Sequence, residues 1–245
     1  MTERHHFLID PKCIKDDRFV LNGSEGHHLK NVVRLGVGDE IYLLDQKGNA
    51  FRSIIDKVAA VEITGHVEET ITDYNSPAVR LHLAIGLLKG NKMVEVAKRA
   101  TELGVFSITP LLMKHSVKRN NNRERLLRVM ASAQKQCGRG LIPELRTSMR
   151  LVDWCQKSPV EFKAFTHPSL DSIPLNRWLN SIKDTEEISL LVGPEGGYHK
   201  DEIAILKRLE ISPVSLGNTR MRSETAAIAA AAVSLEFFHA RKSNV

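Results

Sequence analysis

The amino-acid sequence predicts an α/β protein in which a small, strand-rich part precedes a larger part built on a mostly parallel sheet. Up to about Ile71 the chain shows short strand patterns separated by turn residues, which are typical of a small β-barrel. From Arg80 onward strand and helix patterns alternate, as they do in parallel α/β sheets. Between these parts, the proline and polar residues of Tyr74-Asn75-Ser76-Pro77 interrupt both periodicities. We therefore expect two domains, residues 1–73 and residues 74–245.

Composition and charge narrow the class of protein. The 245 residues carry a formal net charge of +6, which favours an anionic partner without requiring one. The three cysteines have neither zinc-finger nor CxxC spacing, so reduced thiols are expected. Residues 1–10 lack the apolar core of a signal peptide, and the longest apolar run, residues 226–233, is too short to span a membrane. These observations predict a soluble, cytoplasmic protein without a membrane segment or a metal site.

The first part is expected to contain five short strands and one helix. The strands are predicted at residues 7–9, 18–21, 40–44, 50–55 and 61–67. Ser24 is placed to cap a helix that carries His28 and Val33, and Gly36 and Gly38 are expected to end it.

The second part is expected to alternate strands with helices. Strands are predicted at residues 80–88, 105–112, 162–165, 188–192 and 214–216. Asn91 can cap a helix that Gly104 ends, and other helices are expected at residues 123–137, from about His199 and from about Ser223. The last of these is apolar on most sides between residues 226 and 238, which indicates burial in a core or against a second subunit.

Two glycine-rich turns follow strands near the carboxyl end of the chain. The apolar run 188–192 stops at Gly193-Pro194-Glu195-Gly196-Gly197, and the run 214–216 stops at Gly217. Glycines without a Cβ let the backbone approach a ligand closely. Strand ends on one edge of an open α/β sheet form the crevice in which such sheets bind ligands. The pattern indicates a ligand site, and two ordinary strand-to-helix turns are the alternative.

Basic residues are concentrated between residues 114 and 139, where Glu124 is the single acid. Arg123 and Arg125 fall in the first turn of the expected helix, where positive charge opposes the helix dipole. Helix stability therefore does not explain them, whereas contact with RNA phosphates would. A plain basic surface is the alternative. The cations of this segment are Lys114, Lys118, Arg119, Arg123, Arg125, Arg128, Lys135 and Arg139.

Several stretches together resemble the RsmE family of RNA methyltransferases, which belongs to the SPOUT (α/β-knot) superfamily. The most specific match combines Gly193-Pro194-Glu195-Gly196-Gly197 with Leu216-Gly217 and Arg222-Ser223-Glu224-Thr225-Ala226. Weaker matches in the expected order extend the resemblance over nearly the whole chain: His28 to Arg34, Lys92-Met93, Glu102 to Val105, Thr109-Pro110-Leu111, Gln136 to Arg139 and His167-Pro168. The sequence departs from the family at Asn218, Met221 and Ser223, where proline, leucine and threonine are common.

The resemblance implies a PUA-like barrel, a trefoil-knotted SPOUT domain, a homodimer, and S-adenosylmethionine as methyl donor. It implies methylation of N3 of a uridine in the decoding region of 16S ribosomal RNA, with the small ribosomal subunit as partner. The donor-binding residues that it implies are Thr166, His167, Pro168, Gly193, Pro194, Glu195, Gly196, Gly197, Leu216, Gly217, Met221, Arg222, Ser223, Thr225 and Ala226.

RNA contacts are expected from both parts of the chain. In the small part Arg34 is the expected contact. Lys89 and Lys92 flank Gly90 after a strand and could reach a phosphate, although solvated lysines are the alternative. The complete expected set is Arg34, Lys89, Lys92, Arg119, Arg123, Arg125, Arg128 and Arg139.

The implied reaction needs a group that helps uridine N3 to lose its proton, because a neutral imide nitrogen is a poor nucleophile. A base, or a cation that stabilises the anionic uracil, would serve. We assign Arg222 and Arg139 as electrostatic stabilisers and Glu224 as a candidate base. A first-turn helix carboxylate placed for the dipole is the alternative for Glu224.

Two other functions stay open on sequence alone. A non-catalytic RNA-binding ribosome assembly factor would explain the basic segment but would leave the glycine turns without a purpose. A related SPOUT enzyme that methylates a ribose 2′-hydroxyl of another RNA would use the same donor. Rossmann dinucleotide binding is disfavoured, because no GxGxxG follows a strand.

Overall fold

The computed structural model describes residues 4–116, 122–168, 171–183 and 185–243. Contacts divide the chain into two compact units. The first consists of Met1–Ser76 and Ala131–Ile142, and the second of Pro77–Met130 and Pro143–Val245. The first change from one unit to the other falls within the expected linker, Tyr74-Asn75-Ser76-Pro77. The return of residues 131–142 to the first unit was not anticipated, because it depends on contacts between residues far apart in the sequence.

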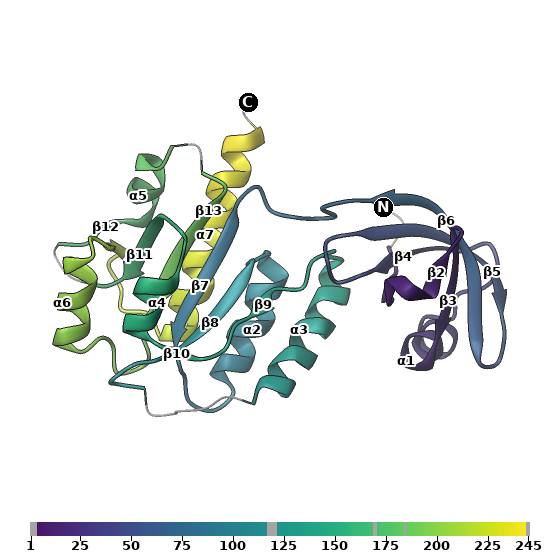
Figure 1. The fold of residues 1–245 in the computed structure, drawn as a ribbon, viewed down its shortest axis with the longest axis horizontal. Coiled ribbons are helices and arrows are strands. Elements are labelled where there is room, and N and C mark those ends of the chain that lie inside the picture. Colours follow the sequence, from purple (N-terminus) through teal and green to yellow (C-terminus); the bar gives the residue numbers. More distant parts are fainter. Residues whose placement is uncertain (1–3, 117–121, 169–170, 184, 244–245) are drawn as a thin grey trace. The chain divides into compact units, whose positions relative to one another are not determined.

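The first unit is built on a sheet with the strand order β1-β4-β5-β6-β3-β2 (Figure 1). Its strands pair antiparallel except for β1 with β4. Phe7, Phe19, Leu29, Ile41 and Ile55 form its buried core. The prediction of a strand-rich first part is confirmed. The elements are β1 His6–Leu8, a 3₁₀-helix Pro11–Cys13, β2 Ile14–Lys15, β3 Arg18–Asn22, α1 Gly23–His27, a π-helix His28–Val33, β4 Glu40–Leu44, β5 Ala50–Val58 and β6 Glu62–Ile71.

The helical segment of the first unit differs from the expectation. Ser24 lies inside α1 rather than capping it, and the preceding Asn22 makes no side-chain cap. The segment then widens into π geometry, in which the Arg34 amide donates to the Leu29 carbonyl at 2.8 Å. It ends at Arg34, which adopts a left-handed conformation with φ 64°, before either predicted glycine. Arg34 is exposed at this bend.

Residues 131–142 join the first unit through specific polar contacts. The Lys135 ammonium lies 2.7 Å from the Glu25 carboxylate, and Asn75 donates to the Gly138 carbonyl at 2.7 Å. Gly138 has φ +66°, and a Cβ there would lie 2.3 Å from the His6 ring. A glycine is therefore required at this bend. Arg139, which follows it, is 3% exposed.

The second unit is an α/β domain in which the described strands pair in parallel, which agrees with the predicted, mostly parallel sheet. The sheet order is β10-β8-β7-β13-β11-β14-β12, with β9 also paired to β8. The strands are β7 Arg80–Gly86, β8 Ser107–Leu112, β9 Glu144–Leu145, β10 Met149–Arg150, β11 Phe162–Thr166, β12 Ile173–Pro174, β13 Glu187–Val192 and β14 Ser212–Ser215. The helices are α2 Lys92–Leu103, α4 Leu151–Lys157, α5 Leu175–Ser181, α6 Lys200–Arg208 and α7 Ser223–Ser243, while α3 Arg123–Cys137 begins in this unit.

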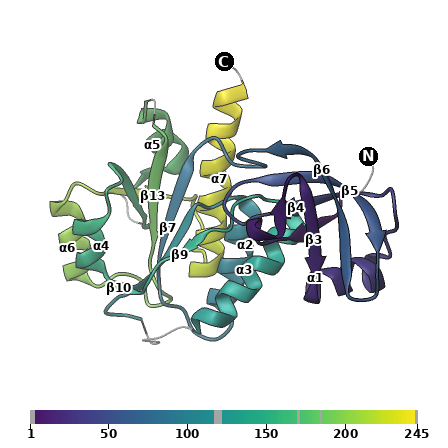
Figure 2. The ribbon, with the colours of Figure 1, turned by 45° about the vertical axis from the view of Figure 1, so that its right-hand side comes forward.

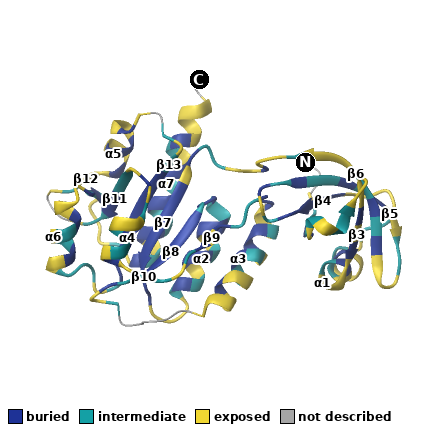
Figure 3. Ribbon diagram, in the orientation of Figure 1, coloured by how far each residue is buried: buried dark blue, intermediate teal, exposed yellow. Residues whose placement is uncertain are grey.

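Helices cover both faces of this sheet. The helices α4 and α6 pack on one face, where Leu151, Trp154 and Leu206 join sheet residues in a buried cluster. On the other face α7 runs along β7 and β13 and contacts α2 (Figure 2). The central strands are buried along most of their length (Figure 3). This explains why the runs 80–86 and 187–192 read as nearly continuous apolar sequence.

The helix boundaries follow the predicted signals closely. Gly104 ends α2 in the left-handed conformation at φ 103°, as predicted. Asn91 precedes that helix but makes no side-chain cap, contrary to the expectation. Before α6, the His199 ring accepts from the Asp201 amide while the Glu202 carboxylate accepts from the His199 amide. None of the helices among the described residues is long and apolar enough to cross a membrane.

Candidate methyl-donor site

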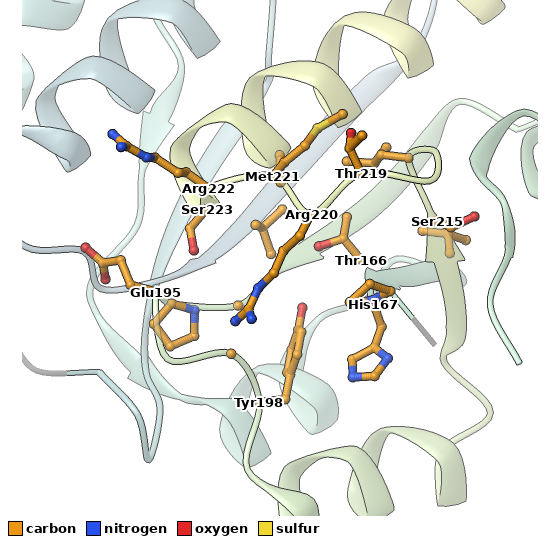
Figure 4. A pocket seen from close by; sticks show the side chains of 18 of the residues that line it. Thr166, His167, Glu195, Tyr198, Ser215, Thr219, Arg220, Met221, Arg222 and Ser223 are labelled. Atoms are coloured by element: carbon orange, nitrogen blue, oxygen red, sulfur yellow. The ribbon is translucent and has the colours of Figure 1, made fainter. Parts of the chain in front are cut away.

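The candidate site lies where three neighbouring strands of the second unit end. Strand β11 lies between β13 and β14, with Phe165 beside Leu191 and Thr166 beside Val214. Because parallel strands end at the same edge, the loops after Thr166, Val192 and Ser215 meet there. They enclose a cavity of about 560 Å³ (Figure 4). Its lining residues are Lys92, Thr166, His167, Pro168, Val192, Gly193, Pro194, Glu195, Gly197, Tyr198, Val214, Ser215, Leu216, Gly217, Thr219, Arg220, Met221, Arg222, Ser223 and Ala226.

The glycine loop after β13 is shaped by close packing. A Cβ on Gly193 would lie 2.9 Å from the Tyr198 ring, and a Cβ on Gly86 of β7 would lie 2.5 Å from Pro194. The Tyr198 hydroxyl donates to the Leu191 carbonyl at 3.1 Å, which anchors the ring. Gly197 has φ +70°, a conformation that side chains rarely adopt. Steric contact at Gly193 and backbone conformation at Gly197 therefore both require glycine.

A charge cluster holds the same loop against the start of α2. The Glu195 carboxylate accepts from the Lys89 amide at 3.0 Å and from the Lys92 ammonium at 3.1 Å. The Lys92 ammonium also lies 3.7 Å from the Glu224 carboxylate. Burial alone would raise the pKa of Glu195, but these hydrogen bonds and the Lys92 charge lower it overall. Glu195 is therefore an ionised loop anchor, and the positive charge of Lys92 is balanced by two carboxylates.

Two aromatic side chains line the cavity wall opposite this cluster. Burial lowers the pKa of His167, and the nearby Lys207 charge lowers it further, so the imidazole is neutral at pH 7. Burial also raises the pKa of the Tyr198 hydroxyl above its ordinary range. The Tyr198 ring packs against Phe165 at 5.4 Å and against His167 at 5.9 Å between centroids. Both side chains are therefore uncharged at neutral pH.

The loop between β14 and α7 contributes two exposed arginines to the lining. The Arg220 side chain extends into the cavity toward Tyr198, whereas the Arg222 guanidinium points away from that ring (Figure 4). Met221, between them, is half-buried. Gly217 has φ +128°, which permits the turn that starts this loop.

Most of the donor-binding residues that the sequence predicted line this cavity. Gly196 and Thr225 do not, and both are exposed. A Cβ on Gly196 would lie 2.8 Å from the His115 side chain, so that glycine serves loop packing. Sequence reasoning missed Val192, Tyr198, Val214, Ser215, Thr219 and Arg220 and gave Lys92 to RNA instead. Proximity to the glycine turns could have suggested Tyr198 and Arg220.

The predicted catalytic residues lie in different places. Arg222 lines the cavity and is exposed. The Glu224 side chain is 15% exposed and lies near Lys92, outside the cavity lining. Arg139 belongs to the first unit, and burial lowers its pKa to about 10. Arg139 is 3% exposed, so in the single chain its side chain is not part of an exposed basic surface, and its roles in RNA contact and catalysis stay predictions.

The basic segment is partly neutralised within the chain. Asp201 pairs with Lys114, and Glu25 pairs with Lys135. Lys118 and Arg119 lie outside the described residues. On α3, Arg123, Arg125 and Arg128 are exposed, and Arg123 donates to the Arg146 carbonyl at 3.5 Å. Among the residues that the structure describes, no three His, Cys, Asp or Glu side chains converge as a group that could hold a metal ion.

Comparison with protein-family models gives two matches. A model described as an RNA methyltransferase domain matches residues 75–235. A model described as an RNA methyltransferase PUA domain matches residues 21–61. The first unit therefore contains the PUA-like domain that the resemblance implied.

Similar proteins carry one recurring name. The ribosomal RNA small subunit methyltransferase E of Synechocystis sp. is 28% identical over 226 residues, 91% of this chain and 74% of that protein. The Bacillus subtilis protein of the same name is 25% identical over 219 residues, 85% of this chain and 86% of that protein.

Solved structures share the fold. A Legionella pneumophila protein described as a methyltransferase, solved in complex with bound S-adenosylmethionine, superposes with a TM-score of 0.80 and 26% identity, over 95% of this chain and 97% of that one. A ribosomal RNA small subunit methyltransferase E of Neisseria gonorrhoeae, solved bound to S-adenosyl methionine, superposes with a TM-score of 0.82 and 24% identity. The superposition covers 94% of this chain and 96% of that one. Because the first family model covers more than half of the chain, this protein belongs to the RNA methyltransferase family that includes the RsmE proteins.

Proposed function

We propose that this protein transfers the methyl group of S-adenosylmethionine to N3 of a uridine in the decoding region of 16S ribosomal RNA. The observation that supports it most directly is the cavity of about 560 Å³ at the ends of β11, β13 and β14. Its size is that of a small-molecule site. The family match suggests S-adenosylmethionine as the small molecule and ribosomal RNA as the polymer that accepts the methyl group. The location proposed for this activity is the cytoplasm.

The lining fits S-adenosylmethionine in its chemistry. Apolar atoms of Leu216, Met221 and Val192 suit an adenine ring, and the hydroxyls of Thr166 and Ser215 suit a ribose. At Gly197, which also lines the cavity, nothing lies within 4 Å of the position that a Cβ would take, so the backbone there is open to a ligand. When bound, the donor supplies a methyl group that is already activated by the sulfonium, so the proposed transfer needs no metal ion.

The protein's own contribution to the chemistry is alignment and charge. Holding N3, methyl and sulfur in line is largely proximity catalysis. Arg222, exposed at the rim of the cavity, is proposed to stabilise the negative charge that uracil acquires as N3 loses its proton. The Glu224 carboxylate is proposed as the base that accepts the N3 proton. It lies 3.7 Å from the Lys92 ammonium and outside the cavity lining, so the uracil would have to reach it there. Two expectations from the family resemblance stay predictions: the role of Arg139 as an electrostatic stabiliser and the trefoil knot of the second domain.

RNA is proposed to bind along the exposed arginines of α3. Neutralising Arg123, Arg125 and Arg128 together is expected to weaken RNA binding about 100-fold at about 0.1 M salt, because three phosphate contacts and their released counterions are lost. The slope of log affinity against log salt should flatten by about 2 to 3. Fluorescence anisotropy with a fragment of ribosomal RNA measures both quantities.

A matched control removes the same charge elsewhere. Arg177, Lys200 and Arg208 are exposed on α5 and α6. Neutralising these three residues together should lower the affinity for RNA much less than the α3 variant does, because only the net charge of the protein changes. An α3 variant that keeps the wild-type salt slope would show that this helix does not contact phosphate.

A second copy of the chain is proposed to cover one side of α7. Four-residue spacings, 228 to 232, 229 to 233 and 233 to 237, connect a set of residues that are half-buried or exposed, with Val233 45% exposed: Ile228, Ala229, Ala232, Val233 and Phe237. Small and apolar side chains at this spacing suit close helix packing in a dimer. Sedimentation equilibrium should then give twice the 27.5 kDa of one chain. A monomeric mass at micromolar concentration would contradict it.

Nucleoside analysis of ribosomal RNA from cells that lack the protein tests the whole proposal. N3-methyluridine is expected to disappear from the small-subunit RNA and to return with the wild-type gene. Loss of a ribose 2′-O-methyl group instead would favour the other SPOUT reaction. Unchanged nucleosides, with no heat of binding for S-adenosylmethionine in calorimetry, would favour a non-catalytic assembly factor.

A further inference from the structure

Arg220 is a positively charged side chain inside the candidate donor cavity. It lies in the loop between β14 and α7, and its side chain extends toward Tyr198 (Figure 4). Arg222 also lines the cavity, but its guanidinium points away from Tyr198. The two arginines therefore face different surroundings, although they are close in sequence.

The charge of Arg220 is not balanced by the cavity. Within the part of the chain that the structure describes, Arg220 makes no ion pair. The lysine that lines the cavity, Lys92, is held by Glu195 at 3.1 Å and Glu224 at 3.7 Å. His167 is neutral at pH 7, because burial lowers its pKa. Arg220 therefore gives the cavity a positive charge that a ligand can neutralise.

We propose that Arg220 binds the α-carboxylate of the methyl donor; the assignment rests on the function proposed above. S-adenosylmethionine carries two positive groups, the sulfonium and the α-ammonium, and one negative group, the carboxylate. A guanidinium repels the first two and matches the third in charge and in planar, two-pronged geometry. Arg220 thereby selects an orientation in which the carboxylate faces the guanidinium and the methyl group is directed away from it.

The competing source of negative charge is the RNA. Arg220 is exposed as well as cavity-lining, so a phosphate or an anionic uracil is a chemical alternative. The position of its side chain beside Tyr198, whose hydroxyl donates to the Leu191 carbonyl, favours a ligand held within the cavity. The test is therefore designed around the carboxylate itself.

Calorimetry compares S-adenosylmethionine with its decarboxylated form, which lacks the carboxylate and keeps the sulfonium and the amine. The wild-type protein is expected to bind the complete donor about 10- to 100-fold more tightly than the decarboxylated one. Arg220→Ala should lose most of that preference, chiefly by weaker binding of the complete donor. Arg220→Lys should keep an intermediate preference, since it retains the charge but not the planar fork.

Arg208→Ala is the matched control, because it removes an exposed arginine of α6 that does not line the cavity. It should keep the wild-type preference. If Arg220→Ala weakens both ligands equally, or leaves both unchanged while lowering kcat/KM for RNA, the carboxylate assignment is wrong. A wild-type protein that binds neither ligand would instead contradict the proposed function, so the two failures are distinguishable.

Discussion

Replacing Gly193 with alanine is expected to weaken binding of S-adenosylmethionine about 100-fold or more while leaving the fold intact. The new Cβ would lie 2.9 Å from the Tyr198 ring, closer than such atoms approach in proteins. The ring cannot easily yield, because its hydroxyl is bound to the Leu191 carbonyl and its face packs against Phe165. The loop that lines the cavity must then move, and a loss of about 2.8 kcal/mol of its contacts with the donor weakens binding about 100-fold.

Calorimetry with the donor measures this loss, and thermal unfolding checks the fold. Gly90→Ala is a suitable control, since the ideal Cβ of Gly90 meets nothing within 4 Å; unlike Gly193, Gly90 has a positive φ, +59°. It carries backbone strain without disturbing the cavity, and Gly90 does not line it. Donor affinity that stays at the wild-type value in Gly193→Ala would mean that the glycine loop does not form the donor site.

Arg222→Ala is expected to lower the rate of methyl transfer about 100-fold with little change in donor affinity. The proposed role of Arg222 is to stabilise negative charge on uracil as N3 is deprotonated, and removal of one such electrostatic contact costs about 100- to 1000-fold in rate. Single-turnover rates at saturating RNA and donor report this step directly. Higher pH should recover part of the rate of the Arg222→Ala protein, because N3 of the substrate uridine is then deprotonated in a larger fraction of the RNA. The rate of Arg222→Lys should lie between those of the wild type and Arg222→Ala, since lysine keeps a positive charge.

A matched experiment separates chemistry from binding. Donor affinity and RNA affinity are measured for the same Arg222→Ala protein, and both are expected to remain within about a factor of three of wild type. Full turnover at saturation would remove Arg222 from the chemistry. A loss confined to RNA affinity would place the side chain in substrate binding rather than in the transition state.

The alternation of short apolar runs with glycine turns was sufficient to predict the site's backbone. Residues 188–192 and 214–216 read as buried strands ended by glycine, and the structure has strands at Glu187–Val192 and Ser212–Ser215. Strands buried on both faces leave this local signature regardless of their neighbours. The start of α6 at Lys200 and the start of α7 at Ser223 were likewise signalled by local residues.

The partners of charged side chains, in contrast, cannot be predicted from local sequence. The sequence predicts that Lys92 contacts RNA or is solvated, whereas in the structure it is paired with Glu195 and Glu224, which lie more than a hundred residues away in the chain. Arg139 ends the predicted basic segment, and its side chain is 3% exposed in the structure. Charge counted along a sequence does not reveal which cations the fold neutralises.

By itself, the sequence determined the two-part α/β architecture, the parallel strands and the glycine turns, because these depend on periodicity and on backbone freedom within a few residues. Only the tertiary structure placed β11 between β13 and β14, brought Tyr198 against Gly193, and directed Arg220 rather than Arg222 toward the cavity interior. Those features depend on strand order and on packing between distant segments. No local pattern encodes them, because the same turn could end a strand at any position in the sheet.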